Sequence, residues 1–346
     1  MLNKRSIRAI PYAMLIAVGY LYAFAAAILF GANGSLTKVM IDAGLSALQV
    51  TQFRVVGAAL VAGLVLLVLD RNSLRVTKSQ IWPLIAMGIG GVALLQAGYA
   101  LAIQRLPVGI ALLIEYLAGP SVALIAFFFF KERVRRRIWV SIGLIMGGLS
   151  IVAQVWNFSL DLIGVFWGLV AAASLTTYFL VGERQMETIS PLALMFWSMS
   201  VAAVFWAFFS KWWDIDWASF STPISLQGNL SGVEVSLWTM LAFNILLGSF
   251  APFLLSLAAI KKLTATAAGI AATSEIAFAF AAAWLWLDQT LGGFQVAGAV
   301  LVLGGIILAQ TARRSPVPIS ADLALETGPI ILPELVEELS KEPPNR

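Results

Sequence analysis

Three ionisable side chains stand inside long apolar runs of this chain, where charge is costly. Arg54 lies in the run 48–69, Glu115 in the run 108–130 and Glu275 in the run 264–287. A charge at the centre of a bilayer costs about 2.5–3.5 kcal/mol on insertion scales, so it is kept only with a partner or a function. The chain has no histidine and no cysteine, so it lacks the usual proton shuttle and any thiol catalyst. The two carboxylates are therefore the candidates for carrying a proton or recognising an ammonium group.

The depth of these groups suggests how they are used. At about 1.5 Å of rise per helical residue, Arg54 and Glu115 both lie about 10 Å below the same membrane surface, where they could face each other. Either they form an ion pair that locks two helices, or Glu115 belongs to a cavity that binds an ammonium group or a proton. Glu275 lies about 16 Å from the opposite surface, with no basic residue at its depth. It is either a proton-coupling group or a structural carboxylate hydrogen-bonded to Thr273, Ser274 or the backbone.

Several neutral residues in the apolar runs are candidates for the same cavity. A tyrosine in a span packs between helices about as often as it contacts a ligand, and asparagine or serine can hydrogen-bond across helices. Asn33 and Tyr99 are favoured because of their depth. The neutral candidates are Asn33, Ser35, Gln96, Tyr99, Tyr116, Tyr178, Asn244 and Ser256.

The elements that carry these residues are predicted to be membrane-spanning helices. Of the 346 residues, 60% are hydrophobic and 12% are charged, and the mean hydropathy is +0.90. Such a composition has too little polar surface for a soluble domain. Because a spanning helix needs about 20 mostly apolar residues, we predict an all-α membrane protein with ten spans. They cover residues 12–37, 48–69, 82–104, 108–130, 138–155, 163–182, 192–212, 235–258, 264–287 and 293–312.

The charges between the spans predict the orientation of the chain. Lysine and arginine concentrate on the cytoplasmic side of membrane proteins. Basic residues precede the first span, and the loops on the same side include the run KERVRRR at 131–137. The opposite loops carry only Lys38, Arg105 and Lys211 as basic residues. We therefore predict that both termini are cytoplasmic.

The second half of the chain repeats the first. Residues 107–154 align with residues 263–310 without a gap, and residues 45–54 align with residues 189–198. The extra residues of the second half lie in a polar loop at about 214–234. Because each repeat has five spans, an odd number, the two repeats must be inverted relative to one another, and the substrate site of such transporters lies near the midplane between them. The predicted organisation is a cytoplasmic N-terminus at 1–11, a first repeat at 12–155, a second repeat at 163–312 and a flexible cytoplasmic tail at 313–346.

Four motifs resemble those of a known family: FGANGSLTK at 30–38, QFR at 52–54, ALLIEYLAGP at 111–120 and VLVLGGIILAQ at 300–310. The chain resembles the drug/metabolite transporter superfamily, of the type with two EamA domains and ten helices, and looks closest to its threonine and homoserine exporter branch. The resemblance covers about residues 20–311 and also favours Asn33 and Tyr99 as site residues. The ninth helix of the family usually carries a Glu-Pro pair. This chain has Glu275-Ile276 there, so the proline that breaks that helix is missing.

Together these features predict a secondary active transporter that exports small metabolites, amino acids first among them, by proton antiport and alternating access. Its expected surroundings are a cell membrane, the bacterial plasma membrane, with protons, lipid and a small solute as partners. A broader metabolite or drug carrier, or an uptake permease, is the alternative within transport. The sequence shows no phosphate loop, metal cluster or nucleophile with its base, so we expect no enzyme, cofactor, metal site or nucleic-acid partner.

Two questions stay open at this stage. A membrane-embedded enzyme or a sensory protein acting through the tail are readings from other classes. A homodimer is also possible, because glycines in the fifth and tenth spans let helices approach closely. Gly143, Gly147, Gly298 and Gly304 could form either an internal seam or a dimer face.

Overall fold

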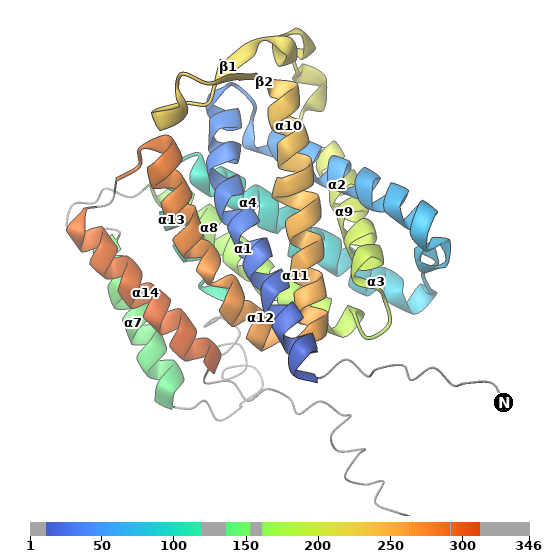
Figure 1. Cartoon of the computed structure of the whole chain (residues 1–346), viewed down its shortest axis with the longest axis horizontal. Helices are drawn as coiled ribbons and strands as arrows, with labels where there is room; N and C mark the ends of the chain where they lie inside the picture. The colour runs from blue at the N-terminus through green and yellow to red at the C-terminus, as the bar shows by residue number, and fades with distance from the viewer. Residues whose placement is uncertain (1–11, 119–135, 153–160, 264, 291, 312–346) are drawn as a thin grey trace, which may run out of the picture. The chain divides into compact units, whose positions relative to one another are not determined.

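The computed structural model describes residues 12–118, 136–152, 161–263, 265–290 and 292–311, most of which are helical. The helices of the first half are α1 (Tyr12–Asp42), α2 (Ala47–Leu69), α3 (Lys78–Ala86), the π-helical segment η2 (Met87–Ala93), α4 (Leu94–Ile103), α5 (Val108–Glu115) and α7 (Arg136–Val152). Those of the second half are α8 (Leu162–Gln185), α9 (Pro191–Ala207), α10 (Leu237–Ile245), the π-helical segment η7 (Leu246–Phe250), α11 (Ala251–Lys262), α12 (Ala265–Ala272), α13 (Ser274–Leu287) and α14 (Gly293–Thr311). A helix lies in each of the ten predicted spans (Figure 1). The end of the predicted fourth span, residues 119–130, lies outside the described residues.

The helices are built to meet lipid. Within the described residues, six are long and apolar enough to cross a membrane: Ile16–Asp42, Ala47–Leu69, Lys78–Ile103, Leu162–Gln185, Leu237–Lys262 and Ala267–Leu287. Trp139–Val152, Pro191–Ala207 and Gly293–Leu308 are shorter apolar helices. On α2, Leu60, Leu64 and Val68 are 63%, 63% and 82% exposed, a row that water would disfavour and acyl chains accept. The chain is therefore an integral, multi-pass membrane protein.

Hydroxyl and carboxyl caps fix where several helices begin. Ser46 accepts a hydrogen bond from the Gln49 backbone N–H, and the Gln49 side chain accepts one from the Ser46 N–H, which is a capping box. Ser190 caps α9 immediately before a proline, and Ser236 caps α10. Each cap satisfies backbone donors that the first helical turn leaves unpaired.

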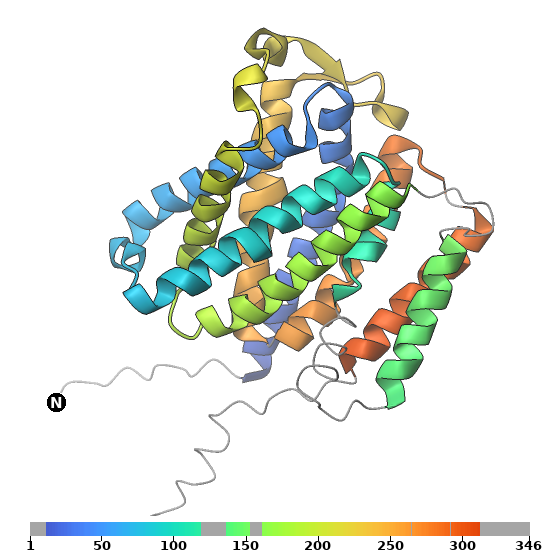
Figure 2. The ribbon, with the colours of Figure 1, turned by 180° about the vertical axis from the view of Figure 1, so that it is seen from behind.

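The two halves of the chain contact each other through matching helices. The first helix of each half lies against the third helix of the other half, so α1 contacts α11 and α8 contacts α4. The second helices, α2 and α9, contact each other, and so do the fifth helices, α7 and α14. Figure 2 shows α4 and α8 side by side. These pairings are the ones that a twofold relation between two repeats requires.

Glycines make the contact between α7 and α14 close. A Cβ atom on Gly148 would lie 2.7 Å from the Gly298 carbonyl oxygen, so the two backbones touch there. Gly305 is likewise packed against the Ser141 carbonyl and Ile145 of α7. Gly298 therefore belongs to an internal seam. Nothing lies within 4 Å of a Cβ built on Gly143, Gly147 or Gly304, so the second reading, a dimer face, stays open for these three.

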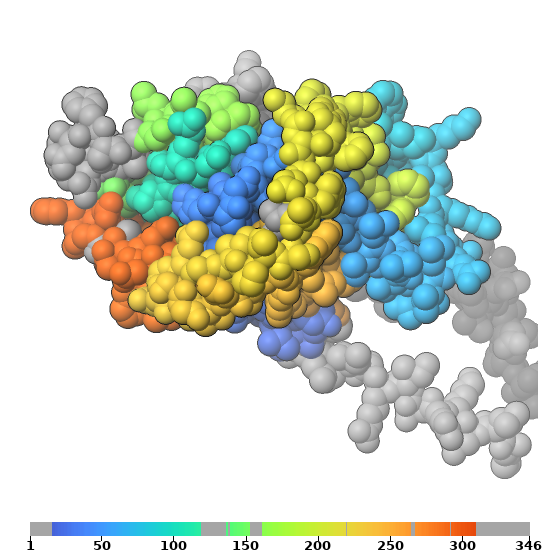
Figure 3. Space-filling view, turned by 90° about the horizontal axis from the view of Figure 1, so that it is seen from above, coloured from blue at the N-terminus to red at the C-terminus, as the bar shows by residue number. Residues whose placement is uncertain are grey.

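A folded segment replaces the plain polar loop expected between residues 214 and 234. It contains the 3-10 turns η4 (Trp212–Asp214), η5 (Trp217–Ser221) and η6 (Gly228–Leu230) and the antiparallel strands β1 (Pro223–Ser225) and β2 (Glu234–Ser236). Asn229 Nδ2 donates to the Leu285 carbonyl and Trp286 Nε1 donates to the Leu226 carbonyl, so the segment is tied to the end of α13. Figures 1 and 3 show it spread over one end of the helices. The counterpart in the first half is only the short 3-10 turn η1 (Arg71–Leu74).

Candidate functional site

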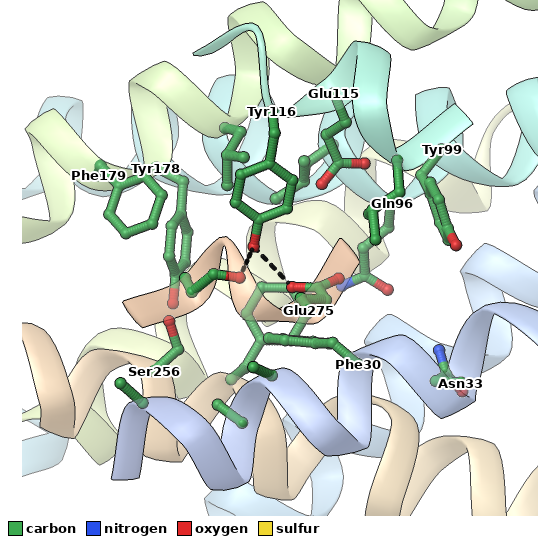
Figure 4. A pocket seen from close by; sticks show the side chains of 18 of the residues that line it. Phe30, Asn33, Gln96, Tyr99, Glu115, Tyr116, Tyr178, Phe179, Ser256 and Glu275 are labelled. Carbon is green, nitrogen blue, oxygen red and sulfur yellow. Dashed lines mark hydrogen bonds between the residues drawn. The ribbon is translucent and has the colours of Figure 1, made fainter. Parts of the chain in front are cut away.

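A cavity lies between the two halves and is lined by both of them. The part of the cavity that the centres of water molecules can occupy has a volume of about 70 Å³. A single water needs about 10–15 Å³ of such volume. The cavity therefore has room for a few waters or a small solute. Nine of the eleven candidate residues line it: Asn33, Arg54, Gln96, Tyr99, Glu115, Tyr116, Tyr178, Ser256 and Glu275. Figure 4 labels all of these except Arg54. The other two, Ser35 and Asn244, are buried outside its lining.

Two helix ends deliver the carboxylates to this space. The helix α5 ends at Glu115, which is 7% exposed, and Tyr116 follows as its C-cap. Glu275 is the second residue of α13, directly after a break at Thr273 that separates α12 from α13. The ninth span is thus broken without the family's proline.

Hydroxyl side chains explain that break. Thr273 Oγ1 donates to the Ile270 carbonyl at 2.6 Å, and Ser274 Oγ donates to the Ala271 carbonyl at 2.7 Å. Serine and threonine that bond back to the preceding turn compete with the backbone ladder and bend helices. The Ile276 N–H accordingly donates to the Thr273 carbonyl, three residues back, at 3.2 Å. The Thr-Ser pair therefore does locally what a proline does elsewhere.

Glu275 has a partner from the other half. The Tyr116 hydroxyl lies 2.8 Å from Glu275 Oε2 and 2.7 Å from the Ala272 carbonyl oxygen. Figure 4 shows the Tyr116 ring reaching across the cavity to both acceptors, with Glu115 and Gln96 beside it. Thr273 and Ser274, the side-chain partners named in the structural alternative, donate to backbone carbonyls instead, and the hydrogen bond of Glu275 joins the end of α5 to α13.

Arg54 is buried, but its partners differ from the expected one. Its Nε donates to Ser249 Oγ at 2.9 Å and its Nη2 donates to the Gly248 carbonyl at 3.1 Å. Among the described residues, no carboxylate oxygen lies within 4.0 Å of its guanidinium, so the first of the two alternatives, an ion pair with Glu115, is wrong. Because of the rotation of α2 about its axis, the Arg54 guanidinium points toward η7 instead. Arg54 thus joins the second helix of one half to the third helix of the other.

Asn33 belongs to a small amide network beside this contact. Its Oδ1 accepts a hydrogen bond from Asn244 Nδ2 at 2.9 Å, and the same Nδ2 lies 3.2 Å from Thr37 Oγ1. Asn33 packs directly against Gly248, where a Cβ atom would collide with the amide oxygen. Its orientation is therefore fixed by α10 and η7.

Two polar atoms of the lining residues have no hydrogen-bond partner in the described part of the chain. They are Arg54 Nη1 and Gln96 Oε1. Buried polar groups are paired in folded proteins in roughly nine cases out of ten. One cationic donor and one acceptor beside a cavity are groups that water or a polar solute would satisfy.

Part of the cavity wall is not marked by any sequence pattern. Phe30, Phe179 and Phe253 also line it, and the Phe253 ring meets Phe30 at 4.9 Å and Tyr178 at 5.7 Å between centroids, edge to face in both cases. The chain has 21 phenylalanines, most in apolar helices, and no sequence signal separates those that face a cavity from those that face lipid. Ser249, the partner of Arg54, was missed for the same reason. In the described residues, no group of three or more histidine, cysteine, aspartate or glutamate side chains is placed to hold a metal ion.

Known proteins resemble this chain over most of its length. The threonine/homoserine exporter RhtA of Salmonella typhimurium strain LT2 is 27% identical over 254 residues, which is 70% of this chain and 76% of that protein. RhtA of Escherichia coli strain K12 is 27% identical over 244 residues, 68% of this chain and 72% of that protein. A solved structure titled only as a crystal structure of a protein has 16% identity and a TM-score of 0.58, and the match covers 85% of this chain and 96% of that one. It shows a common fold.

The family signature covers both halves. EamA-like transporter family sequences match residues 17–154 and again residues 162–311. The two matches coincide with the two predicted repeats, and the expected resemblance is confirmed. Membership of a transporter family also favours transport over catalysis. The chain belongs to the EamA-like transporter family.

Proposed function

We propose that this protein is a secondary active transporter that exports small metabolites, with amino acids as the first candidates, from the bacterial cytoplasm. The RhtA relatives are named for threonine and homoserine, which are small amphipathic solutes. In this proposal the chain crosses the membrane ten times, with both termini inside. Its two inverted halves rock about the cavity to give alternating access.

The observation that carries the proposal is the convergence of buried polar groups from both halves on one cavity. Glu115 and Tyr116 come from the first half and Tyr178 and Glu275 from the second. Burying them costs stability that packing alone does not repay. A site shared by two halves is what alternating access needs, because relative movement of the halves changes which side of the membrane reaches the solute.

The cavity has complementary groups for a zwitterion. Two carboxylates, Glu115 and Glu275, are available for an ammonium group, and the unpartnered Nη1 of Arg54 is available for a carboxylate. The phenylalanine and tyrosine rings offer an apolar wall for a side chain. Because the wall is aromatic, a broader carrier that accepts larger apolar solutes is the second candidate.

Proton antiport is the coupling that we propose, through Glu275 and Glu115. Moving one charge through 100 mV is worth about 2.3 kcal/mol. At about 1.4 kcal/mol for each factor of ten, one proton moving in with the membrane potential supports roughly a 50-fold gradient of a solute with no net charge. One exchanged proton is therefore enough for useful export.

Flux measurements in proteoliposomes test this function. The assay follows labelled threonine, homoserine and aromatic amino acids with and without an imposed pH gradient, for the parent and for Glu275→Gln. Glu187→Gln, an exposed glutamate after α8, is the matched control. We expect gradient-driven flux of at least one solute in the parent and the control, and its loss in Glu275→Gln. Flux that ignores the pH gradient would eliminate antiport, and uptake in place of export in oriented vesicles would support the permease alternative.

The orientation has its own test, because the chain contains no cysteine. Single cysteines at Asn72, within η1, and at Ser231, in the segment that carries β1 and β2, occupy exposed sites. With both termini inside, a membrane-impermeant maleimide added to intact cells labels Ser231→Cys only. Labelling of Asn72→Cys alone would reverse the proposed orientation, and labelling of both or neither would contradict the number of crossings between them.

A further inference from the structure

The Tyr116 hydroxyl lies against more acceptors than it can serve. It has one proton to donate, and two oxygens lie within hydrogen-bond distance: the Ala272 carbonyl at 2.7 Å and Glu275 Oε2 at 2.8 Å. A hydroxyl can also accept. Both short contacts can be hydrogen bonds at once only if the three groups share a second proton. Glu275 is the one of the three that can take up that proton.

The proton on Glu275 decides where the hydroxyl points. When Glu275 is a carboxylic acid, its O–H donates to Tyr116 Oη and the Tyr116 O–H donates to the Ala272 carbonyl. When Glu275 is a carboxylate, the Tyr116 O–H turns to Oε2, because a bond to a charged acceptor is the stronger one. The Ala272 carbonyl then loses this donor.

That carbonyl lies at a sensitive place. Ala272 is the last residue of α12, directly before the break at Thr273. In a continuous helix its carbonyl would accept from the Ile276 N–H, which here donates to Thr273 instead. Losing the Tyr116 donor therefore unpairs a backbone group in a buried setting, a cost of about 1–3 kcal/mol that rearrangement of the break would relieve.

We propose that Tyr116 is a positioning residue that converts the protonation of Glu275 into a change at the break between α12 and α13. The proposal rests on the proposed transport function and deepens it, since it names how the coupling proton reaches the helices. On uptake, one proton binds Glu275 and the hydroxyl turns to Ala272. On release, the proton leaves and the hydroxyl returns to Glu275. No other bond is made or broken.

Tyr116 is the neighbour of Glu275 whose hydrogen bonds can respond to the protonation of Glu275. The titratable or charged side chains around Glu275 in the cavity are Arg54 on α2, Tyr99 on α4, Glu115 at the end of α5, Tyr116 directly after it and Tyr178 on α8. The helices α1 and α12 present only neutral side chains to the cavity. Among the described residues, Tyr116 is the one whose hydrogen bonds join Glu275 to the backbone of another helix. Because α12 packs on α1, α11 and α14, a change at the break reaches both halves.

Hydrogen–deuterium exchange in lipid nanodiscs tests the proposal on the full chain, without any transported solute. Peptides that cover α12 and α13 are followed at several pH values, with exchange times corrected for the intrinsic effect of pH. We expect their protection in the parent to depend on pH, and we expect Tyr116→Phe, which removes only the hydroxyl, to lose that dependence. Tyr20→Phe, on the exposed face of α1, should behave as the parent.

A second variant covers the case in which Tyr116→Phe folds poorly. In Glu275→Gln the amide N–H2 is a permanent donor to Tyr116 Oη, so α12 and α13 should keep the protection of the parent at low pH at every pH. A parent with no pH-dependent protection in this segment would overturn the proposal, and so would a Tyr116→Phe variant that responds like the parent. If the switch is found but no amino acid is transported, the proposed function fails separately.

Discussion

The third helix of each half has the same construction but different chemistry. Both are interrupted by a π-helical segment, η2 in the first half and η7 in the second. Each segment receives a side chain from the second helix of the other half: Trp206 Nε1 donates to the Ala93 carbonyl at 3.0 Å, and Arg54 Nη2 donates to the Gly248 carbonyl at 3.1 Å. Single-turn π segments are frequent at functional sites. The two π-helical segments thus have the same construction, but only η7 is contacted by a cationic side chain, that of Arg54.

The first helices repeat this contrast. Gly91 in η2 lies against the backbone of Tyr178 on α8, and Gly248 in η7 lies against the amide of Asn33 on α1. Around Gly248 in η7 the contact is polar, whereas Gly88 in η2 is packed against the apolar side chain of Val201 on α9. The comparison indicates that packing preserves the twofold framework and that function has made the two sides different. Substitutions at matching places should therefore have unequal effects.

Arg54→Ala should have the largest effect. It removes two hydrogen bonds from a charged donor, each worth about 1.5–3 kcal/mol, and leaves Ser249 Oγ and the Gly248 carbonyl without that donor. We expect amino-acid flux in proteoliposomes to fall at least about tenfold, since 1.4 kcal/mol is a factor of ten. Arg54→Lys keeps the positive charge but loses the planar guanidinium group. Its flux should therefore lie between those of the parent and of Arg54→Ala. Parent-like flux in Arg54→Ala would show that the cation is structural only.

Gly248→Ala should come next. The new methyl group collides with Asn33 Oδ1, so Asn33 must leave Asn244. Overpacking costs about 1–3 kcal/mol, and here it also moves a residue of the cavity wall. We expect the KM for the transported solute to rise. The matching Gly91→Ala brings a Cβ to 3.1 Å from the Tyr178 Cα, so it meets backbone and not the polar end of a cavity side chain. It should lower the unfolding temperature and raise KM less than Gly248→Ala does; an equal rise in KM for both variants would remove the asymmetry.

Trp206→Phe is the neutral counterpart of the Arg54 substitution and should be milder. It deletes one hydrogen bond to the Ala93 carbonyl, worth about 1 kcal/mol, and keeps most of the ring volume. Thermal unfolding in detergent should begin at a slightly lower temperature, while flux stays at the parent level. A loss of flux as large as that of Arg54→Ala would mean that both π segments serve transport equally.

The sequence predicts where the helices lie better than it predicts the contacts between them. Apolar runs mark helices in a membrane protein because lipid demands them, and buried polar residues such as Glu275 are conspicuous against that background. An apolar run does not reveal how its helix is rotated about its own axis. Arg54 could therefore be placed at its depth, but not aimed at Ser249.

Three local structures escaped prediction for physical reasons. The π segments depend on donors from other helices, which no local pattern reveals. The break at Thr273 was tied to a missing proline, although hydroxyls that bond back to the preceding turn produce it. The segment with β1 and β2 was expected as a loop because strands of three residues are too short to show a period.

The smallest effect is expected at the ends of the third helices, where the contrast recurs. Arg105, directly after α4, pairs with Asp161 before α8 at 2.9 Å, whereas Lys262, at the end of α11, lies 5.9 Å above the Tyr22 ring of α1. Hydrogen bonds from the Gly164 N–H, from Arg105 and from the Ile163 N–H hold the pKa of the Asp161 carboxyl below its usual value. A carboxyl with a lowered folded-state pKa stabilises the fold above its unfolded pKa, about 3.9, and that contribution is lost as the pH falls through the folded value.

Asp161→Asn keeps the helix cap and removes the titration. The unfolding temperature of the parent should therefore fall slightly more than that of the variant as the pH drops below about 4. The difference should be small, because the pair is exposed and salt screens it. Tyr22→Phe keeps the ring below Lys262 and removes no carboxylate, so its acid response should match the parent. If Asp161→Asn and the parent lose stability in parallel, the pair contributes nothing and only the packing of α4 on α8 joins the halves there.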